Sequence, residues 1–178
     1  MNYRTLKPES KRQSGVALVV GLLLLVVMTL IGITTMRGTI LEERMAGNYR
    51  DKGLSFQMAE TALRDAELEI KGCASCGRKI SGLTGFASSC DSTGLCYDTD
   101  SSFDPVATLE GGHGVAYGTY TSAPSVPSSI SSAPRYVIEG YKVRPPGAAS
   151  WKYMYRITAI GFGGSDNSRT FLQSAYKP

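Results

Sequence analysis

The first pattern in the chain is an uninterrupted apolar run near its beginning. No charged residue occurs between Gln13 and Met36, and residues 16–33 are almost entirely Leu, Val, Ile, Ala and Gly. A helix needs roughly 20 such residues to cross a hydrocarbon layer of about 30 Å. The run therefore predicts a transmembrane helix over residues 16–36.

Helical periodicity continues after this run, because apolar residues recur at steps of three, four or seven with charged residues between them. We therefore predict one helix over residues 16–71, with 37–71 as its amphipathic part. Two shorter helices broken near Gly38 or Gly47 are the alternative. The apolar stripe comprises Leu41, Met45, Tyr49, Phe56, Ala59, Leu63, Ala66 and Ile70. The charged back comprises Glu42, Glu43, Arg44, Arg50, Asp51, Lys52, Glu60, Arg64, Asp65, Glu67 and Glu69.

The pattern changes at Gly72, which ends the helix as a C-cap glycine does. Residues 72–134 are rich in Gly, Ser, Thr, Pro and Asp, which predicts a long looped region. Alternation returns in residues 135–143, 151–163 and 168–176, which Pro-Pro-Gly and GSDN turns separate. The last segments predict a three-stranded antiparallel sheet within residues 135–178.

These elements together predict an α+β fold. In the strand at 151–163, one face carries Tyr153, Tyr155, Ile157 and Ala159. We expect this apolar face of the sheet to cover the amphipathic part of the helix. Leu41, Met45, Tyr49, Phe56 and Leu63 are the candidate helix-packing residues, either on the chain's own sheet or on neighbouring molecules.

The basic character of the chain is local. The formal net charge of the 178 residues is +4, and +3 of it lies ahead of Ser14. About +1 is left for the rest of the chain, so the charge indicates membrane topology rather than a nucleic-acid partner. By the positive-inside rule, the amino end stays in the cytoplasm and the residues after Arg37 are exported.

The apolar run is longer than the core of a conventional secretory signal. Such a signal has roughly 7 to 15 apolar residues and then a small-x-small cleavage site. Here Thr34, Thr35, Met36 and Arg37 follow instead. Two interpretations remain, an uncut membrane anchor or a cut at the inner face directly before the run.

The four cysteines, Cys73, Cys76, Cys90 and Cys96, all lie in the first part of the looped region. The spacing C-x2-C, thirteen residues, C-x5-C does not match the usual zinc ribbon, and an exported domain is in an oxidising compartment. Disulfides are therefore favoured over a zinc site or a redox motif. Four cysteines permit three pairings, among which the sequence does not choose.

No group of residues points convincingly to catalysis or to a cofactor. Asp98, Asp100 and Asp104 are spaced like calcium ligands, but Phe103 occupies the position where a calcium loop needs glycine. A solvated loop is the favoured interpretation. His113 lies in a GGHG loop without an identifiable nucleophile, so we expect no enzyme, no metal and no cofactor. Packing is favoured over binding for Tyr117, Tyr120 and Tyr136.

A basic leader, a glycine directly before a long apolar helix, an amphipathic continuation and a closing antiparallel sheet resemble type IV pilins. Residues 12–64, and within them LEERMAGN, are similar to the amino-terminal region of minor pilins of the PilX family. Residues 153–176 are similar to the terminal hairpin of these proteins. The resemblance implies a pilin-like fold with a globular head, in which the disulfides favoured above would hold the looped region.

The resemblance also implies processing. A prepilin peptidase would remove residues 1–15 by cutting between Gly15 and Val16, and Val16 would be N-methylated. Pilins usually carry glutamate at the fifth position after the cut, and here that position is Val20. In the family this glutamate is taken to neutralise the free amine of an adjacent subunit. A subunit without it fits a starting or tip position better than a repeated place in the shaft.

The function implied by the resemblance is that of a non-enzymatic minor pilin that primes or joins the type IV pilus, near its tip, and supports pilus biogenesis, twitching motility and adhesion. Its expected partners are other minor pilins, the major pilin, a tip adhesin, the prepilin peptidase and the inner-membrane assembly platform. We expect it in the inner membrane before assembly and in the extracellular pilus afterwards. A type II secretion pseudopilin and a single-span protein with a periplasmic ligand-binding domain are the alternatives.

Overall fold

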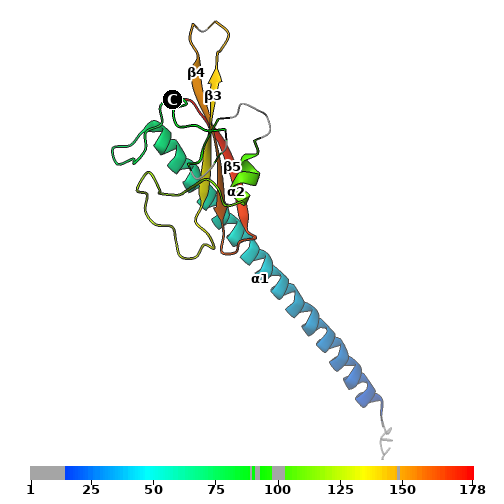
Figure 1. The fold of residues 1–178 in the computed structure, drawn as a ribbon. Coiled ribbons are helices and arrows are strands. Elements are labelled where there is room, and N and C mark those ends of the chain that lie inside the picture. The colour runs from blue at the N-terminus through cyan, green and yellow to red at the C-terminus, as the bar shows by residue number, and fades with distance from the viewer. Residues whose placement is uncertain (1–14, 89, 91–92, 98–102, 148) are drawn as a thin grey trace, which may run out of the picture. The chain divides into compact units, whose positions relative to one another are not determined.

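The computed structural model describes residues 15–88, 90, 93–97, 103–147 and 149–178. It divides into two compact units, with the boundary between Ala46 and Gly47. A single helix, α1 (Val16–Lys71), supplies the first unit and continues into the second (Figure 1). The predicted single helix is therefore confirmed, without a break at Gly38 or Gly47.

Helix α1 ends where the sequence predicts. Gly72 has a φ of +78°, a left-handed conformation that glycine adopts without a steric penalty. Its N–H donates to the carbonyls of Leu68, at 3.0 Å, and Glu69, at 3.2 Å. These bonds satisfy carbonyl groups that the end of a helix would otherwise leave without a partner.

The predicted antiparallel meander is present in the second unit. β3 (Arg135–Val143) pairs antiparallel with β4 (Lys152–Phe162), which pairs antiparallel with β5 (Arg169–Tyr176). The register sets Ile138 opposite Ile157, so the apolar positions of neighbouring strands share one face. The α+β class predicted from the sequence is confirmed.

Two short strands extend the predicted three-stranded antiparallel sheet, and both lie in residues 72–134, which the sequence predicts to be a long looped region. β1 (Leu95–Tyr97) pairs parallel with β3, and β2 (Val115–Ala116) pairs antiparallel with it. The sheet is therefore mixed, in the order β1-β3-β4-β5 with β2 beside β3. Strands of two or three residues are too short to show an alternating pattern, so their sequence resembles that of a loop.

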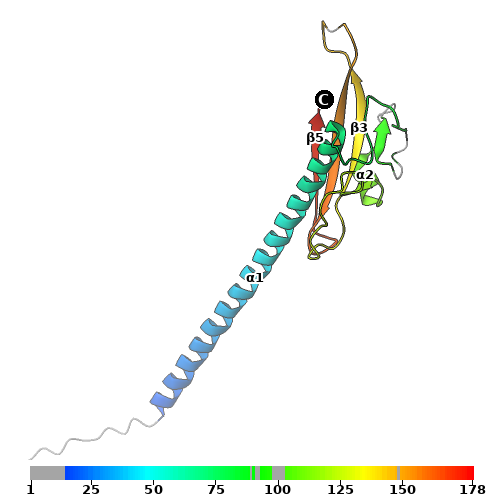
Figure 2. The ribbon, with the colours of Figure 1, turned by 90° about the vertical axis from the view of Figure 1, so that its left-hand side faces the viewer.

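The part of α1 in the second unit packs on one face of the sheet through small residues (Figure 2). Ala59, Ala62 and Ala66 are fully buried there. The closest approach is at Gly161 in β4, where an added Cβ would lie 2.1 Å from the Ala59 nitrogen and 2.3 Å from the Ser55 carbonyl oxygen. The rest of this core comes from Ile70, Leu95, Val115, Tyr136, Ile138, Tyr155, Ile157 and Ala159.

The opposite face of the sheet carries a second core that the sequence pattern did not predict. Helix α2 (Pro105–Glu110) places Leu109 there, against Val137 and Ile160. Asp104 caps α2 by accepting hydrogen bonds from the N–H groups of Val106 and Ala107. The sheet is thus covered on both faces, by α1 on one and by α2 with its adjoining loops on the other.

Candidate assembly site

The outstanding surface of the first unit is its apolar helix. Every side chain described from Val16 to Ala46 is exposed, and an 18-residue stretch has a mean hydropathy of 3.1 with none of it buried. The helix is long and apolar enough to cross a membrane. Exposed apolar surface of this extent is stable only against lipid or against other protein.

The polar side chains within this helix do not weaken its apolar surface. The hydroxyls of Thr29 and Thr34 donate to the carbonyls three residues earlier, each at 2.8 Å. Thr35 donates to the Ile31 carbonyl at 2.9 Å. Because these donors are satisfied within the helix, the segment suits an environment that offers no hydrogen bonds.

Four of the five predicted packing residues are exposed. Tyr49 is 83% exposed and Phe56 is 48% exposed, and Leu41 and Met45 are exposed as well. Of the five candidates, Leu63 alone contacts the helix-facing core, as a partly buried residue. Large side chains would hold the helix away from β4, whereas the alanines let it approach. For the four exposed residues, packing on neighbouring molecules stays a prediction. Tyr49 and Phe56 line a shallow groove with Lys52, Gly53, Gln57 and Glu60.

Polar side chains of α1 attach it to the turn between β4 and β5. Asp51 accepts from the Gly164 N–H and from the Ser165 hydroxyl. The bond from the Gly164 N–H is the main cause that lowers the pKa of Asp51. One turn further along, Ser55 Oγ lies 2.7 Å from Thr170 Oγ1. These contacts fix the position of the helix along the sheet, which a sliding apolar contact alone would not do.

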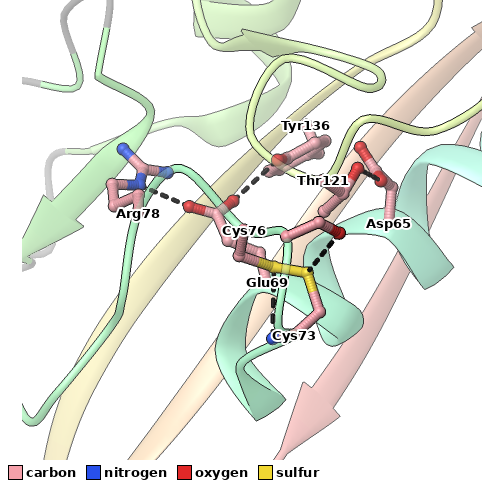
Figure 3. The surroundings of a disulfide bond; sticks show 8 residues. Asp65, Glu69, Cys73, Cys76, Arg78, Thr121 and Tyr136 are labelled. Carbon is pink, nitrogen blue, oxygen red and sulfur yellow. Dashed lines mark hydrogen bonds and ion pairs between the residues drawn. A yellow bond between two sulfur atoms is a disulfide. The ribbon is translucent and has the colours of Figure 1, made fainter.

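Two acids near the end of α1 are buried, which corrects their assignment to the solvated back of the helix (Figure 3). Asp65 accepts from the Thr121 hydroxyl and, at 2.8 Å, from the Gly118 N–H. Glu69 accepts from Arg78 Nε and, at 2.7 Å, from the Tyr136 hydroxyl. Both acids therefore bind the region after the helix onto it. The periodic pattern alone does not distinguish such an acid from a solvated one.

Arg78 links three parts of this cluster. Its Nη1 donates to the Thr93 carbonyl at 2.6 Å, and its guanidinium lies 4.0 Å from the centre of the Tyr120 ring. Burial, followed by the Glu69 carboxylate, raises the pKa of Tyr136 far above its ordinary value. Tyr136 therefore keeps its proton and remains a donor to Glu69.

A second ion pair, in which the carboxylate is buried and the arginine is partly exposed, lies on the other face of the sheet. Glu139 of β3 is opposite Arg156 of β4, and Arg156 Nε donates to its Oε2 at 2.8 Å. The Tyr141 hydroxyl donates to the same carboxylate at 2.9 Å. All the acceptor oxygens of Glu139 thus have charged or polar partners, as a buried carboxylate requires. Glu139 and Arg156 lie in different strands, so the alternating pattern of each strand does not reveal their pairing.

The four cysteines form two local pairs. Cys73 pairs with Cys76, with Cα atoms 5.1 Å apart, and Cys90 pairs with Cys96, with Cα atoms 4.8 Å apart. This arrangement selects one of the three pairings that the sequence left open. Cys73 and Cys76 lie at the surface directly after α1, whereas Cys90 and Cys96 are buried in the core beneath α2.

Comparison with models of protein families identifies the family of this chain. The model described as PilX N-terminal matches residues 14–64, and the model described as Type IV pilus assembly protein PilX C-term matches residues 81–178. This chain belongs to the PilX family. Membership implies a structural role in type IV pilus assembly and interaction with other components of the pilus. No curated protein and no solved structure matches the chain significantly.

The family matches agree with the division of the PilX-family chain into helix and sheet. The first match covers the apolar helix and its continuation as far as Arg64, and the second covers the sheet. Between them, residues 65–80 carry Glu69, Cys73, Cys76 and Arg78. Glu69 and Arg78 therefore lie in the interval that neither match covers, whereas their partner Tyr136 lies within the second match.

The remaining sequence candidates of this PilX-family chain do not assemble into a site in the part that the structure describes. Asp98 and Asp100 lie outside the described residues, and Asp104 caps α2. His113 is exposed in the loop after α2. Tyr136 and Tyr120 pack in the helix-facing core, as the packing interpretation predicted. Among the described residues, no three metal-ligating side chains lie together.

The two disulfides are expected to differ in their accessibility to reductants. Thiol–disulfide exchange requires the attacking thiolate to reach a sulfur atom. In the folded protein, a mild thiol reductant should therefore open Cys73–Cys76 before Cys90–Cys96. Alkylation at successive times, followed by peptide mass analysis, measures this order. Simultaneous opening of both pairs without unfolding would contradict the prediction.

Proposed function

We propose that this protein is a minor pilin that is processed at the inner membrane and primes the type IV pilus. Residues 1–15 form the leader, which a prepilin peptidase removes by cutting between Gly15 and Val16, and Val16 is then N-methylated. The mature chain keeps residues 16–36 first as a membrane anchor and later as part of the filament core. The head, residues 47–178, faces the periplasm before assembly.

The observation that carries this proposal is the fully exposed apolar helix in a chain of the PilX family. A secretion signal that is discarded needs no continuation, but here the same helix continues into the residues that pack on the sheet. The start of the helix supports the proposed cut. Gly15 has a φ of +101°, and regular helix begins at the next residue.

Val20 supports a special position in the fibre. After the proposed cut, the amine of Val16 is charged, and a buried ammonium without a counter-charge is unfavourable. A glutamate at position 20 would supply that counter-charge to a neighbouring subunit, whereas the Val20 side chain is apolar. We therefore assign the protein to the start or tip of the pilus, with other minor pilins, the major pilin and a tip adhesin as partners and the inner-membrane platform as the place of assembly. In this position it supports pilus biogenesis, twitching motility and adhesion.

The amino terminus of the membrane-extracted protein tests the proposed processing. Intact mass and amino-terminal sequencing should show a chain that starts at methylated Val16. Gly15→Leu should retain the leader, whereas Gly21→Leu, in the same segment but away from the cut, should be processed normally. Retention of residues 1–15 in the wild-type protein would overturn the proposal and indicate a plain membrane anchor.

Val20→Glu tests the assigned position. If the missing carboxylate keeps the subunit at the start of the fibre, Val20→Glu should lower the number of pili and distribute the protein along the shaft. Val27→Glu, seven residues later on the same helix face, is the matched control for a carboxylate in the apolar segment. Pilus counts and immunogold labelling measure both effects. An unchanged number and an unchanged location for Val20→Glu would count heavily against the priming role.

A further inference from the structure

A β-hairpin projects beyond the rest of the sheet. Figures 1 and 2 both show the ends of β3 and β4 extending past the end of α1 and past β5. The last strand pairs are Lys142 with Tyr153 and Val143 with Lys152. We call residues 142–153, apart from residue 148, the basic hairpin. Gly147, with a φ of +81°, turns the chain at its end.

The basic hairpin combines aromatic rings with cations. The register places Lys142 opposite Tyr153, and Arg144 and Trp151 directly follow and precede the last strand pair, Val143 with Lys152. Trp151 is the only tryptophan of the chain and is 60% exposed. An isolated exposed leucine would need no explanation, but an exposed tryptophan and tyrosine beside two cations form a distinct surface.

The charges within the basic hairpin itself have one sign. Lys142, Arg144 and Lys152 are all exposed, and no acidic residue occurs anywhere in 140–165. The neighbouring loop is also free of acids, because none occurs in 70–90. That loop lies against the base of the hairpin, where Gly82 accepts a 2.8 Å hydrogen bond from the Tyr155 hydroxyl. Its exposed Lys79 adds a further cation to this end of the unit.

We propose that the basic hairpin is a docking element for the surface of an anionic phospholipid bilayer. Tryptophan and tyrosine favour the boundary between headgroups and acyl chains, where the ring is apolar and the N–H or O–H stays hydrated. Lysine and arginine are attracted to anionic headgroups at the same depth. The hairpin offers both chemistries at the end of a projecting element, which reaches a flat surface without obstruction from the rest of the unit.

Two other occupants fit this surface less well. A second copy of the hairpin would bring two sets of cations together without an acid between them. A folded protein partner needs roughly 800 Å² on each side of a stable interface, which a narrow hairpin end does not offer. A lipid surface sets no such requirement, because several headgroups surround the inserted residues independently. This inference involves different residues from the proposed processing and assembly, and it goes beyond them.

The sole tryptophan makes the proposal directly measurable. The full chain is placed in nanodiscs of phosphatidylcholine, which accept its apolar helix, and is then mixed with separate vesicles. Vesicles that contain phosphatidylglycerol should shift the Trp151 emission to shorter wavelengths, and vesicles of phosphatidylcholine alone should not. Brominated acyl chains present only in the added vesicles should quench this emission, because the ring reaches the acyl boundary.

Matched variants separate the two contributions in a vesicle flotation assay. Replacing Lys142 and Lys152 together by glutamine should weaken capture about 25-fold, since each cation contributes roughly fivefold. Trp151→Ser should weaken capture roughly tenfold. Arg64→Gln and Tyr49→Ser remove an exposed cation and an exposed aromatic ring elsewhere in the second unit, and should leave capture unchanged.

Three results would overturn the proposal. Capture that is equal for neutral and anionic vesicles would remove the role of the cations. Capture by anionic vesicles without quenching of Trp151 would show attraction without insertion. Binding of soluble polyanions such as heparin or single-stranded DNA, with no capture by anionic vesicles, would assign the basic hairpin to a different class of partner.

Discussion

Replacing Arg78 by alanine is expected to destabilise the second unit by about 3 to 5 kcal/mol, because the substitution leaves a buried charge without its partner. The Arg78 side chain is 17% exposed and the Glu69 side chain is fully buried. After the substitution, Glu69 keeps the hydrogen bond from Tyr136 but loses the guanidinium. The change in the free energy of unfolding is measured by chemical denaturation, followed through the near-ultraviolet circular dichroism of the tyrosines.

Arg64→Ala is the matched control for this prediction. Arg64 also pairs with a glutamate of α1, Glu60, but the two side chains are 73% and 41% exposed. Such a surface pair contributes about 1 kcal/mol or less. The double variant Glu69→Gln and Arg78→Met should recover part of the loss, because it removes both charges together. If Arg78→Ala and Arg64→Ala lowered the free energy of unfolding equally, the buried Glu69 ion pair would contribute no more stability than a surface pair.

Replacing Gly161 by alanine is expected to have an effect of similar or greater size. The new methyl group would lie 2.1 Å from the Ala59 nitrogen, far inside the van der Waals contact distance to the α1 backbone. Neither β4 nor the helix can yield easily, because polar contacts at Asp51 and Ser55 fix the helix on the sheet. We expect a loss of about 3 kcal/mol or more, at the upper end of the usual cost of overpacking. Thermal unfolding and resistance to proteolysis measure it.

Gly53→Ala is the control for the substitution itself. An added Cβ at Gly53 has no atom within 4 Å, and alanine is favoured over glycine in a helix by about 1 kcal/mol. This variant should therefore be as stable as the wild type or more stable. A fully stable Gly161→Ala protein would mean that the helix does not approach the sheet as closely as the structure shows.

The sequence predicted the long elements because their patterns are local. The helix shows its period over 56 residues, and the alternation of β3, β4 and β5 extends over eight to eleven residues each. By contrast, Asp65 and Glu69 follow the same spacing as solvated acids. Their burial depends on Thr121 and Arg78, which the pattern of the helix does not encode. The parallel pairing of β1 and the second core around Leu109 depend on distant partners in the same way.

The candidate site was predictable in part for the same reason. The apolar helix is recognisable in the sequence as a continuous run, whereas the roles of Gly15, Val16 and Val20 come from the family resemblance and stay predictions. The helix-packing residues were harder to assign, because periodicity identifies a face but not the partner that covers it. Small residues turn out to face the sheet, and the large residues Tyr49 and Phe56 remain outside. A rule that weighs side-chain size at close approaches would have favoured the alanines.

The hydrogen bonds between α1 and β5 determine when, during synthesis, the packing of the sheet on the helix can be completed. Ser55 and Thr170 are separated by 115 residues, and Glu67 accepts a hydrogen bond from Ser174 across 107 residues. Contacts of such high sequence separation form slowly, because a long loop must close before they yield any stabilisation. During synthesis, β5 emerges more than a hundred residues after the helix segment that it contacts. The helix face that these residues cover must therefore remain exposed until synthesis of the chain is almost complete, and during this interval a chaperone has access to it.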